Sequence, residues 1–281
     1  MYADDTILSA ASISTTELQT KINNDLTNIR NWLLTNKLSL NAAKTEYIFF
    51  GTDFRLSNLG KVSPVTIGDK QIKRVNNTKY LGVYLDENLK WDNHIDNLCT
   101  KVSRSISGLK EARNYASLDI LKVIYNALIQ PVFDYCDVVW GNLNKRLSSR
   151  IQKLQNRAAR IVTFQGYDVR SADLLKYLNW DNLALKRNKH LSLLMYDTIN
   201  HNVPKYLSDL FSKCSEGNSC KSRLRQSDLN VTIIFQTQNV ISDHFHIEVY
   251  INYISINQTI SLFLSLSLSL SLPPSLSLPR I

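Results

Sequence analysis

Apolar residues recur at helical spacing over most of the second half of the chain, and this pattern is the strongest constraint on its fold. From Trp91 onward the apolar residues three or four positions apart are Ile95, Leu98, Val102, Ile106 and Leu109. Because an α-helix has 3.6 residues per turn, this spacing places them on one face. We expect a second helix from about Ser117 to the break at Pro131, a third from about Asn144, and further helix between 171 and 211.

The first 86 residues mix helix and strand patterns. Ser14 and Glu17 have the spacing of a capping box. The helix they open carries an apolar stripe of Leu18, Ile22, Leu26, Ile29 and Leu33. Strands are expected at 6–10, 44–50 and 79–86, where β-branched and aromatic residues gather or apolar residues alternate. This part therefore has an α/β pattern.

Composition, cysteine spacing and targeting signals limit the classes of protein to which the chain can belong. A chain of 281 residues, 44% hydrophobic and 20% charged, can bury the core of one large or two small domains, which excludes a collagen-like or wholly disordered chain. The four cysteines have no paired CxxC spacing, so neither a disulfide scaffold nor a zinc site is predicted. No basic, apolar leader and no window of about 18 apolar residues is present, which favours an intracellular protein, nuclear or cytoplasmic.

The net charge of +9 is concentrated in one segment. Residues 141–230 hold 16 Lys and Arg against 7 Asp and Glu, and no acid occurs between Asp137 and Asp168. In the helix from Asn144, cations recur one position before each apolar residue of its stripe: Arg146, Arg150, Lys153, Arg157 and Arg160. Such a row predicts contacts with nucleic-acid phosphates. The alternative is a solvated face that only keeps the helix soluble.

The C-terminal segment, 230–281, has a different composition from the rest. Residues 265–272 are a strict Ser-Leu alternation, which is what a CT dinucleotide repeat encodes in any frame of that strand. We expect this tail to be unstructured.

Tyr2-Ala3-Asp4-Asp5 is the motif with catalytic content. Two-metal phosphoryl transfer needs hard carboxylate oxygens around two Mg²⁺ ions, and adjacent aspartates can supply part of that cage. Read in isolation, two adjacent aspartates also suit an exposed turn.

Several ordered motifs extend this pattern along the chain. They are Trp32-Leu33, Asn36 to Asn41, Lys44-Thr45-Glu46, Ile48-Phe49-Phe50, Lys79 to Val83, Asp86 to His94, Tyr125, Pro131, Tyr135, Trp140-Gly141, Leu154 to Arg160 and Arg223-Leu224-Arg225. In this order the chain resembles the reverse transcriptases (RNA-directed DNA polymerases) of jockey-like retrotransposons without long terminal repeats. The resemblance covers roughly residues 1–229.

The resemblance implies a role for several residues. Asp4 and Asp5 would be metal-binding carboxylates of the polymerase palm, and Tyr2 would lie beside the incoming nucleotide. Lys44 would lie near the leaving pyrophosphate, although it also suits a lysine at a strand start. Leu81 and Gly82 match the primer-grip hairpin, where the glycine can also be read as a bend in a strand.

The resemblance is partial. A third metal-binding aspartate and the fingers precede this motif in the family, and the first strand of its hairpin is absent here. We therefore expect an α+β fragment: a partial palm at 1–86, a helical thumb-like or connection region at 87–229, and the tail at 230–281.

The family's reaction uses Mg²⁺, deoxynucleotides, an RNA template and a DNA primer. Because the metal site is incomplete, we expect this chain alone to be inactive, so its status as an enzyme is open. The alternatives are a non-catalytic nucleic-acid-binding helical module and a pseudogene product.

Overall fold

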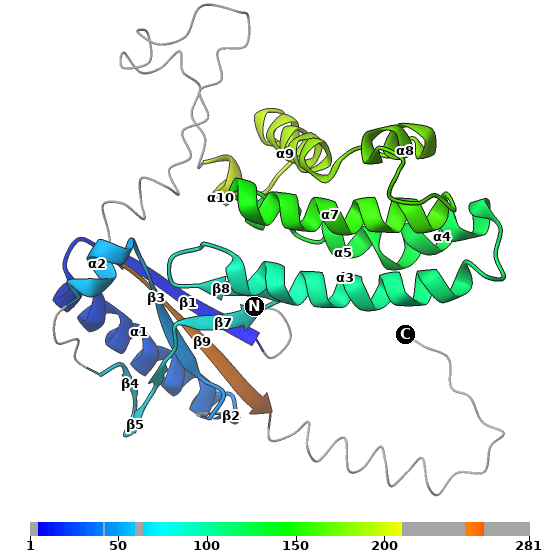
Figure 1. Cartoon of the computed structure of the whole chain (residues 1–281). Helices are drawn as coiled ribbons and strands as arrows, with labels where there is room; N and C mark the ends of the chain where they lie inside the picture. The colour runs from blue at the N-terminus through cyan, green and yellow to red at the C-terminus, as the bar shows by residue number, and fades with distance from the viewer. Residues whose placement is uncertain (1–4, 42, 60–63, 210–244, 256–281) are drawn as a thin grey trace, which may run out of the picture. The chain divides into compact units, whose positions relative to one another are not determined.

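The chain divides into two compact units, described separately below. In this computed structural model, residues 5–41, 43–59, 64–209 and 245–255 are described (Figure 1). One unit comprises Met1–Thr78 with Asn239–Ile281, and the other comprises Lys79–Gln238. The mixture of helix and strand confirms the expected α+β class.

The first unit is built on a mixed sheet. Its strands are β1 (Asp5–Ser12), β2 (Leu38–Leu40), β3 (Glu46–Phe50), β6 (Lys73–Arg74) and β9 (Phe245–Ser255). The order is β1-β9-β3-β6, and β2 also pairs with β9. β9 is antiparallel to both β1 and β3, with Val249 opposite Leu8 on one side and Tyr47 on the other. β9 is therefore the strand that joins the rest of the sheet.

This strand corrects two predictions for the chain ends. The tail was expected to be unstructured, but Phe245–Ser255 form β9, and 230–244 and 256–281 lie outside the described residues. The strand at 6–10 was expected to lack an antiparallel partner because the first strand of its hairpin is absent, but β9 pairs with it antiparallel. The physical reason lies in the sequence of β9, whose β-branched and aromatic residues suit a strand although the Ser-Leu repeat beyond it does not.

Helix α1 (Thr15–Thr35) packs against the sheet through the predicted stripe. Leu18, Ile22 and Leu26 are fully buried, and they share a core with Tyr47 and Phe49 of β3. Ser14 is the N-cap residue as expected, but its side chain makes no capping hydrogen bond. The capping box is wrong in this detail, because Glu17 instead accepts a 2.7 Å hydrogen bond from Ser12.

Short elements complete this unit. They are α2 (Asp53–Ser57), β4 (Thr66–Ile67), which pairs with β5 (Lys70–Gln71), and the start of β7 (Asn77–Tyr80). β7 pairs with β8 (Val83–Asp86), so the single strand expected at 79–86 is a hairpin that turns at Leu81 and Gly82.

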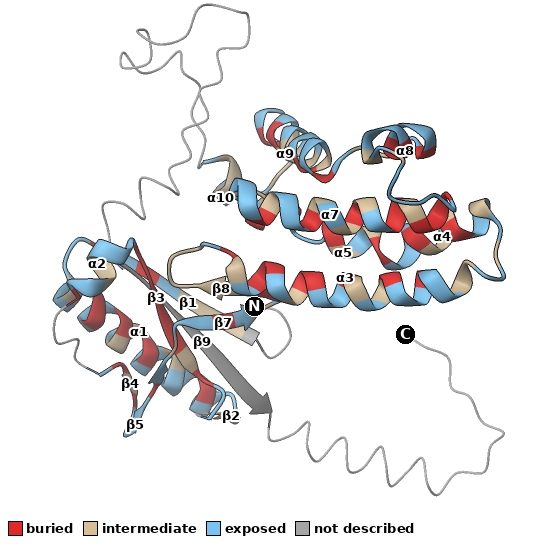
Figure 2. Cartoon of the chain, in the orientation of Figure 1, coloured by how far each residue is buried: buried red, intermediate tan, exposed pale blue. Residues whose placement is uncertain are grey.

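The second unit is helical. Its helices are α3 (Asp92–Ala112), α4 (Leu118–Leu128), α5 (Gln130–Asp134), α6 (Asp137–Trp140), α7 (Lys145–Val162), α8 (Ser171–Leu178), α9 (Leu183–Ile199) and α10 (Lys205–Ser208). α3 and α7 pack side by side. Figure 2 shows buried residues recurring along both helices, and they form one core with Tyr125 and Trp140. The predicted stripe of α3 is wholly buried.

Candidate nucleic-acid interface

The predicted metal-binding pair lies at the edge of the described structure. Tyr2 and Asp4 are outside the described residues, and Asp5 is the first residue of β1, opposite Asn252. Lys44 is exposed in the turn before β3, where its backbone N–H donates to the carbonyl of Asn41. The roles of these four residues therefore stay predictions.

Leu81 and Gly82 form a tight turn that α5 supports from the side. Both have positive φ, +43° and +85°, in the left-handed region that glycine adopts without strain. The hydroxyl of Tyr135 donates a 2.6 Å hydrogen bond to the Leu81 carbonyl, and its ring would lie 3.4 Å from a Cβ at Gly82. The turn is thus held by a residue 54 positions away in sequence.

His94 lies beside this turn. The backbone N–H of Tyr84 donates to its Nδ1 (3.3 Å), while its buried Nε2 has no partner among the described residues. Burial, and then the charge of Lys101, lower the pKa of His94 below its usual value. A cavity of about 260 Å³ is lined by His94, Gly82, Lys101 and Tyr135 among others.

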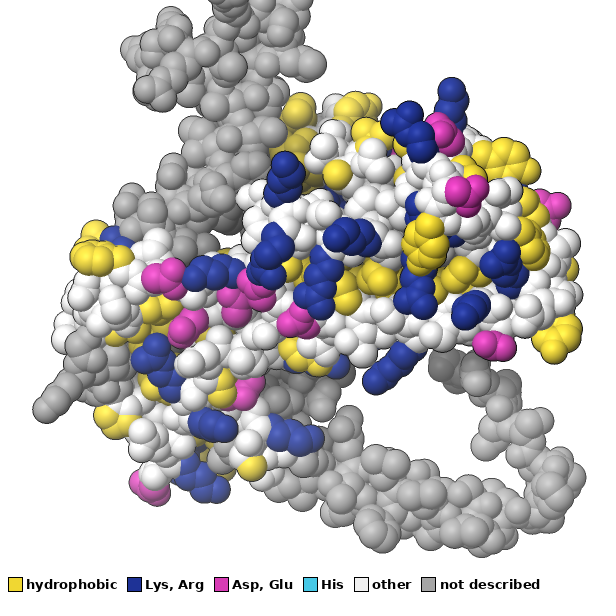
Figure 3. Space-filling model, in the orientation of Figure 1, with side chains coloured by type: hydrophobic (Ala, Val, Ile, Leu, Met, Phe, Trp, Pro, Cys, Tyr) yellow, Lys and Arg dark blue, Asp and Glu magenta, His cyan; other side chains and the backbone are white. Residues whose placement is uncertain are grey.

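The predicted row of cations follows one side of α7, which begins at its N-cap Asn144 as expected. Figure 3 shows Lys and Arg side chains over the visible face of the helical unit, with hydrophobic side chains between them. Arg146 is paired with Asp92 and Arg150 with Asp96 of α3. These two cations are thus already neutralised by carboxylates.

Beyond Asp96 the next acid of α3 is Glu111, near the end of the helix. Residues 97–110 of α3 contain Lys101, Arg104 and Lys110 but no Asp or Glu. Lys153 and Arg157 are exposed, and neither makes an ion pair within the described part of the chain. The second half of the α3–α7 face therefore carries uncompensated positive charge.

Arg160, the last cation of the row, supports a loop. Its guanidinium donates to the carbonyl oxygens of Gly166 (3.1 Å) and Val169 (3.4 Å) and to the hydroxyl of Ser171 (2.8 Å). It also lies 4.9 Å from the centre of the Tyr167 ring. Arg160 therefore fixes the connection between α7 and α8.

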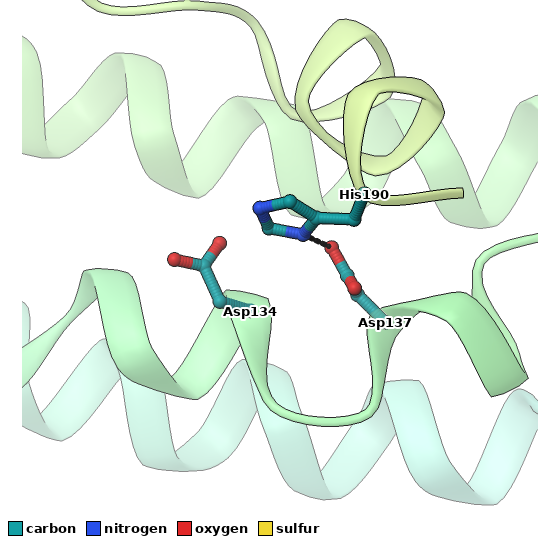
Figure 4. Close-up of side chains that lie close together, drawn as sticks. All are labelled: Asp134, Asp137 and His190. Atoms are coloured by element: carbon teal, nitrogen blue, oxygen red, sulfur yellow. Dashed lines mark hydrogen bonds and ion pairs between the residues drawn. The ribbon is translucent and has the colours of Figure 1, made fainter. Parts of the chain in front are cut away.

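Two carboxylates and a histidine converge elsewhere in the unit (Figure 4). His190 Nδ1 lies 2.6 Å from an oxygen of the buried Asp137, and Lys186 pairs with Asp134 at 3.0 Å. Gln130 donates to the other oxygen of Asp134. Three such groups could hold a metal ion, but these pairs already satisfy the carboxylates and attach α9 to α5 and α6.

Sequence reasoning missed these tertiary partners. Asp92 and Asp96 share one face of α3 at a spacing of four, which is the only signal that could have paired them with α7. Asp137 and His190 are 53 positions apart, and no local pattern connects them. None of the described helices is long and apolar enough to cross a membrane.

A cluster of Lys and Arg along one helical face is typical of nucleic-acid-binding proteins. The chain is similar to a probable RNA-directed DNA polymerase from transposon BS of Drosophila melanogaster, 28% identical over 195 residues, or 68% of this chain and 21% of that protein. It is similar to the corresponding polymerase from transposon X-element of the same species, 27% identical over 57% of this chain and 18% of that protein. A third relative is the RNA-directed DNA polymerase from mobile element jockey of Drosophila funebris, 27% identical over 62% of this chain and 19% of that protein.

These relatives confirm the resemblance to jockey-like retrotransposon reverse transcriptases. The chain spans about a fifth of the length of the curated relatives it matches. No protein-family model matches the chain, and no solved structure matches it.

Proposed function

We propose that this chain is part of a retrotransposon RNA-directed DNA polymerase, and that its helical unit binds the phosphate backbone of nucleic acid. The observation that carries the proposal is the part of the α3–α7 face beyond Arg150, where Lys153 and Arg157 are exposed and have no carboxylate partner among the described residues. The similarity to mobile-element polymerases supports the same function. In this proposal, 1–86 is palm and 87–229 is thumb or connection.

The catalytic part of the proposal concerns the residues around β1. Asp4 and Asp5 supply hard carboxylate oxygens, which suit Mg²⁺, and Tyr2 lies beside the nucleotide. Bound Mg²⁺ would activate the attacking oxygen and neutralise charge on the phosphates. Lys44 would stabilise negative charge on pyrophosphate, and the turn at Leu81 and Gly82 would position the primer end.

Two carboxylates alone hold two metal ions weakly, so we expect no deoxynucleotide incorporation by the 281-residue chain. Primer extension on an RNA template with Mg²⁺ tests this, with Asp4→Asn/Asp5→Asn as control. Incorporation that this double variant abolishes would show an active polymerase and contradict the expected inactivity.

Phosphate binding is tested by fluorescence anisotropy with an RNA–DNA hybrid across a salt series. Lys153→Gln/Arg157→Gln should weaken binding and flatten the slope of log affinity against log salt by about 2, since each phosphate contact contributes roughly 0.9. Arg146→Gln/Arg150→Gln is the matched control, because these cations already pair with Asp92 and Asp96. Equal effects of the two double variants would contradict the assignment to Lys153 and Arg157.

A further inference from the structure

The loop between α7 and α8 presents two aromatic rings to solvent. Phe164 is 45% exposed and Tyr167 is 82% exposed. Both belong to the connection that Arg160 fixes through three of its hydrogen bonds. An anchored loop that exposes two rings differs from a surface with scattered apolar residues, because the rings keep a defined position.

Each ring has an arginine over it. Arg113, just after α3, has its guanidinium carbon 4.9 Å from the centre of the Phe164 ring. Arg160 has the same 4.9 Å distance to the Tyr167 ring. An arginine covers one face of a ring, so the exposed area of Tyr167 leaves ring surface open for stacking.

The backbone of Phe164 is unusual for an aromatic residue. Its φ is +60°, in the left-handed region that side chains with a Cβ seldom adopt. Such a conformation is unfavourable for a residue with a Cβ and persists only where the surroundings impose it. The loop thus holds the apolar ring of Phe164 toward solvent, although exposure of the ring and the left-handed backbone conformation are both unfavourable.

The helix that leads into this loop is positively charged. No Asp or Glu occurs in the sequence from Val138 to Tyr167, and the exposed Arg157 lies less than two helical turns before the loop. Asp168 is the acid within the loop itself. A polyanion whose units also carry flat aromatic groups complements both the cations and the rings, and single-stranded nucleic acid has this chemistry.

We propose that unpaired bases of single-stranded nucleic acid stack on Phe164 and Tyr167 while Lys153 and Arg157 contact the adjoining phosphates. Arg113 and Arg160 hold the rings and strengthen stacking from the opposite face. The inference rests on the proposed function for the phosphate contacts, and it adds a base-binding site at the end of the basic face.

The experiment separates bases from phosphates. Binding of the full chain to a labelled single-stranded oligonucleotide about ten nucleotides long is compared with binding to an abasic strand of equal length. Each stacked base contributes at least about fivefold, so stacking on two rings predicts that the abasic strand binds roughly 30-fold more weakly or more. Phe164→Leu and Tyr167→Leu should each weaken binding of the intact strand while leaving the abasic strand unaffected.

Two variants serve as controls. Tyr167→Phe keeps the ring and should bind like the parent. Tyr177→Leu removes a tyrosine that is 68% exposed on α8 but has no arginine over its ring among the described residues, so it should also bind like the parent. Thermal unfolding of each variant checks that the fold is intact. If a Leu variant unfolds, base stacking is tested on the parent chain alone, by comparing its affinity for the intact and the abasic strand.

The outcomes distinguish the two proposals. Equal affinity of the parent for intact and abasic strands overturns base stacking while leaving phosphate binding in place. Failure of the parent to bind either strand or the hybrid overturns both. Equal loss from Tyr177→Leu and Tyr167→Leu overturns the assignment of the site to this loop.

Discussion

The hydroxyl of Tyr135 donates a 2.6 Å hydrogen bond to the carbonyl of Leu81, and this bond joins α5 to the turn between β7 and β8. Both residues belong to the motifs that carry the sequence resemblance, and the structure brings them into contact. The turn predicted to grip a primer end is therefore not a free loop.

Removing this bond should loosen the turn. Tyr135→Phe is expected to destabilise the helical unit by about 0.5–1 kcal/mol, because the residue is exposed and water can replace the lost donor. Backbone amide exchange in residues 79–86 should accelerate more than exchange in α7. Tyr115→Phe changes an exposed tyrosine in the α3–α4 turn and should have no effect. Unchanged exchange at the turn in Tyr135→Phe would show that the bond does not stabilise it.

The lowered pKa of His94 predicts a pH dependence of stability. Burial and Lys101 lower its pKa in the folded state, so protonation favours unfolding. The stabilising contribution is complete above the unfolded pKa of about 6.5 and is lost as the pH falls through 6.5 toward the lower folded value. Urea unfolding between pH 7.5 and 5 measures this, with a slope of at most ~1.4 kcal/mol per pH unit from one proton.

His94→Asn is the matched variant, since its side-chain oxygen can accept from the Tyr84 N–H as Nδ1 does. Its stability should vary less with pH over the same interval than that of the parent. A parent and a variant with parallel pH profiles would mean that another group causes the dependence.

Periodicity predicted the elements better than it predicted their partners. The stripe from Leu18 to Leu33 and the start of a helix near Asn144 followed from local spacing, because each depends on residues within one helix. The hydrogen bond from Tyr135 to Leu81 and the pairing of β9 with β1 join segments far apart in the sequence. For the same reason the row of cations could be seen in the sequence, but not its division into paired and unpaired halves.

The central position of β9 makes the sheet depend on it. Val249→Pro removes a backbone donor from a strand that is paired on both sides, so it should destabilise the first unit by about 3 kcal/mol or more. Amide exchange should then rise in β1 and β3, with little change in α3 and α7. Val249→Ala keeps the N–H and should have a smaller effect. Retained protection of β1 in the proline variant would show that β9 does not hold the sheet together.

The pair of His190 and Asp137 should couple α9 to α6 without a metal ion. Burial raises the pKa of Asp137, while its hydrogen bond to His190 acts in the opposite direction. His190→Ala leaves this buried carboxyl without its partner and should cost about 1–3 kcal/mol of unfolding free energy.

The double variant Asp137→Ala/His190→Ala should be less destabilised than the sum of its single variants, because the two residues share one interaction. Because Lys186 and Gln130 already satisfy Asp134, Mn²⁺ or Zn²⁺ should not raise the Tm of the parent. A Tm that rises with either metal and loses this response in His190→Ala would instead establish a metal site.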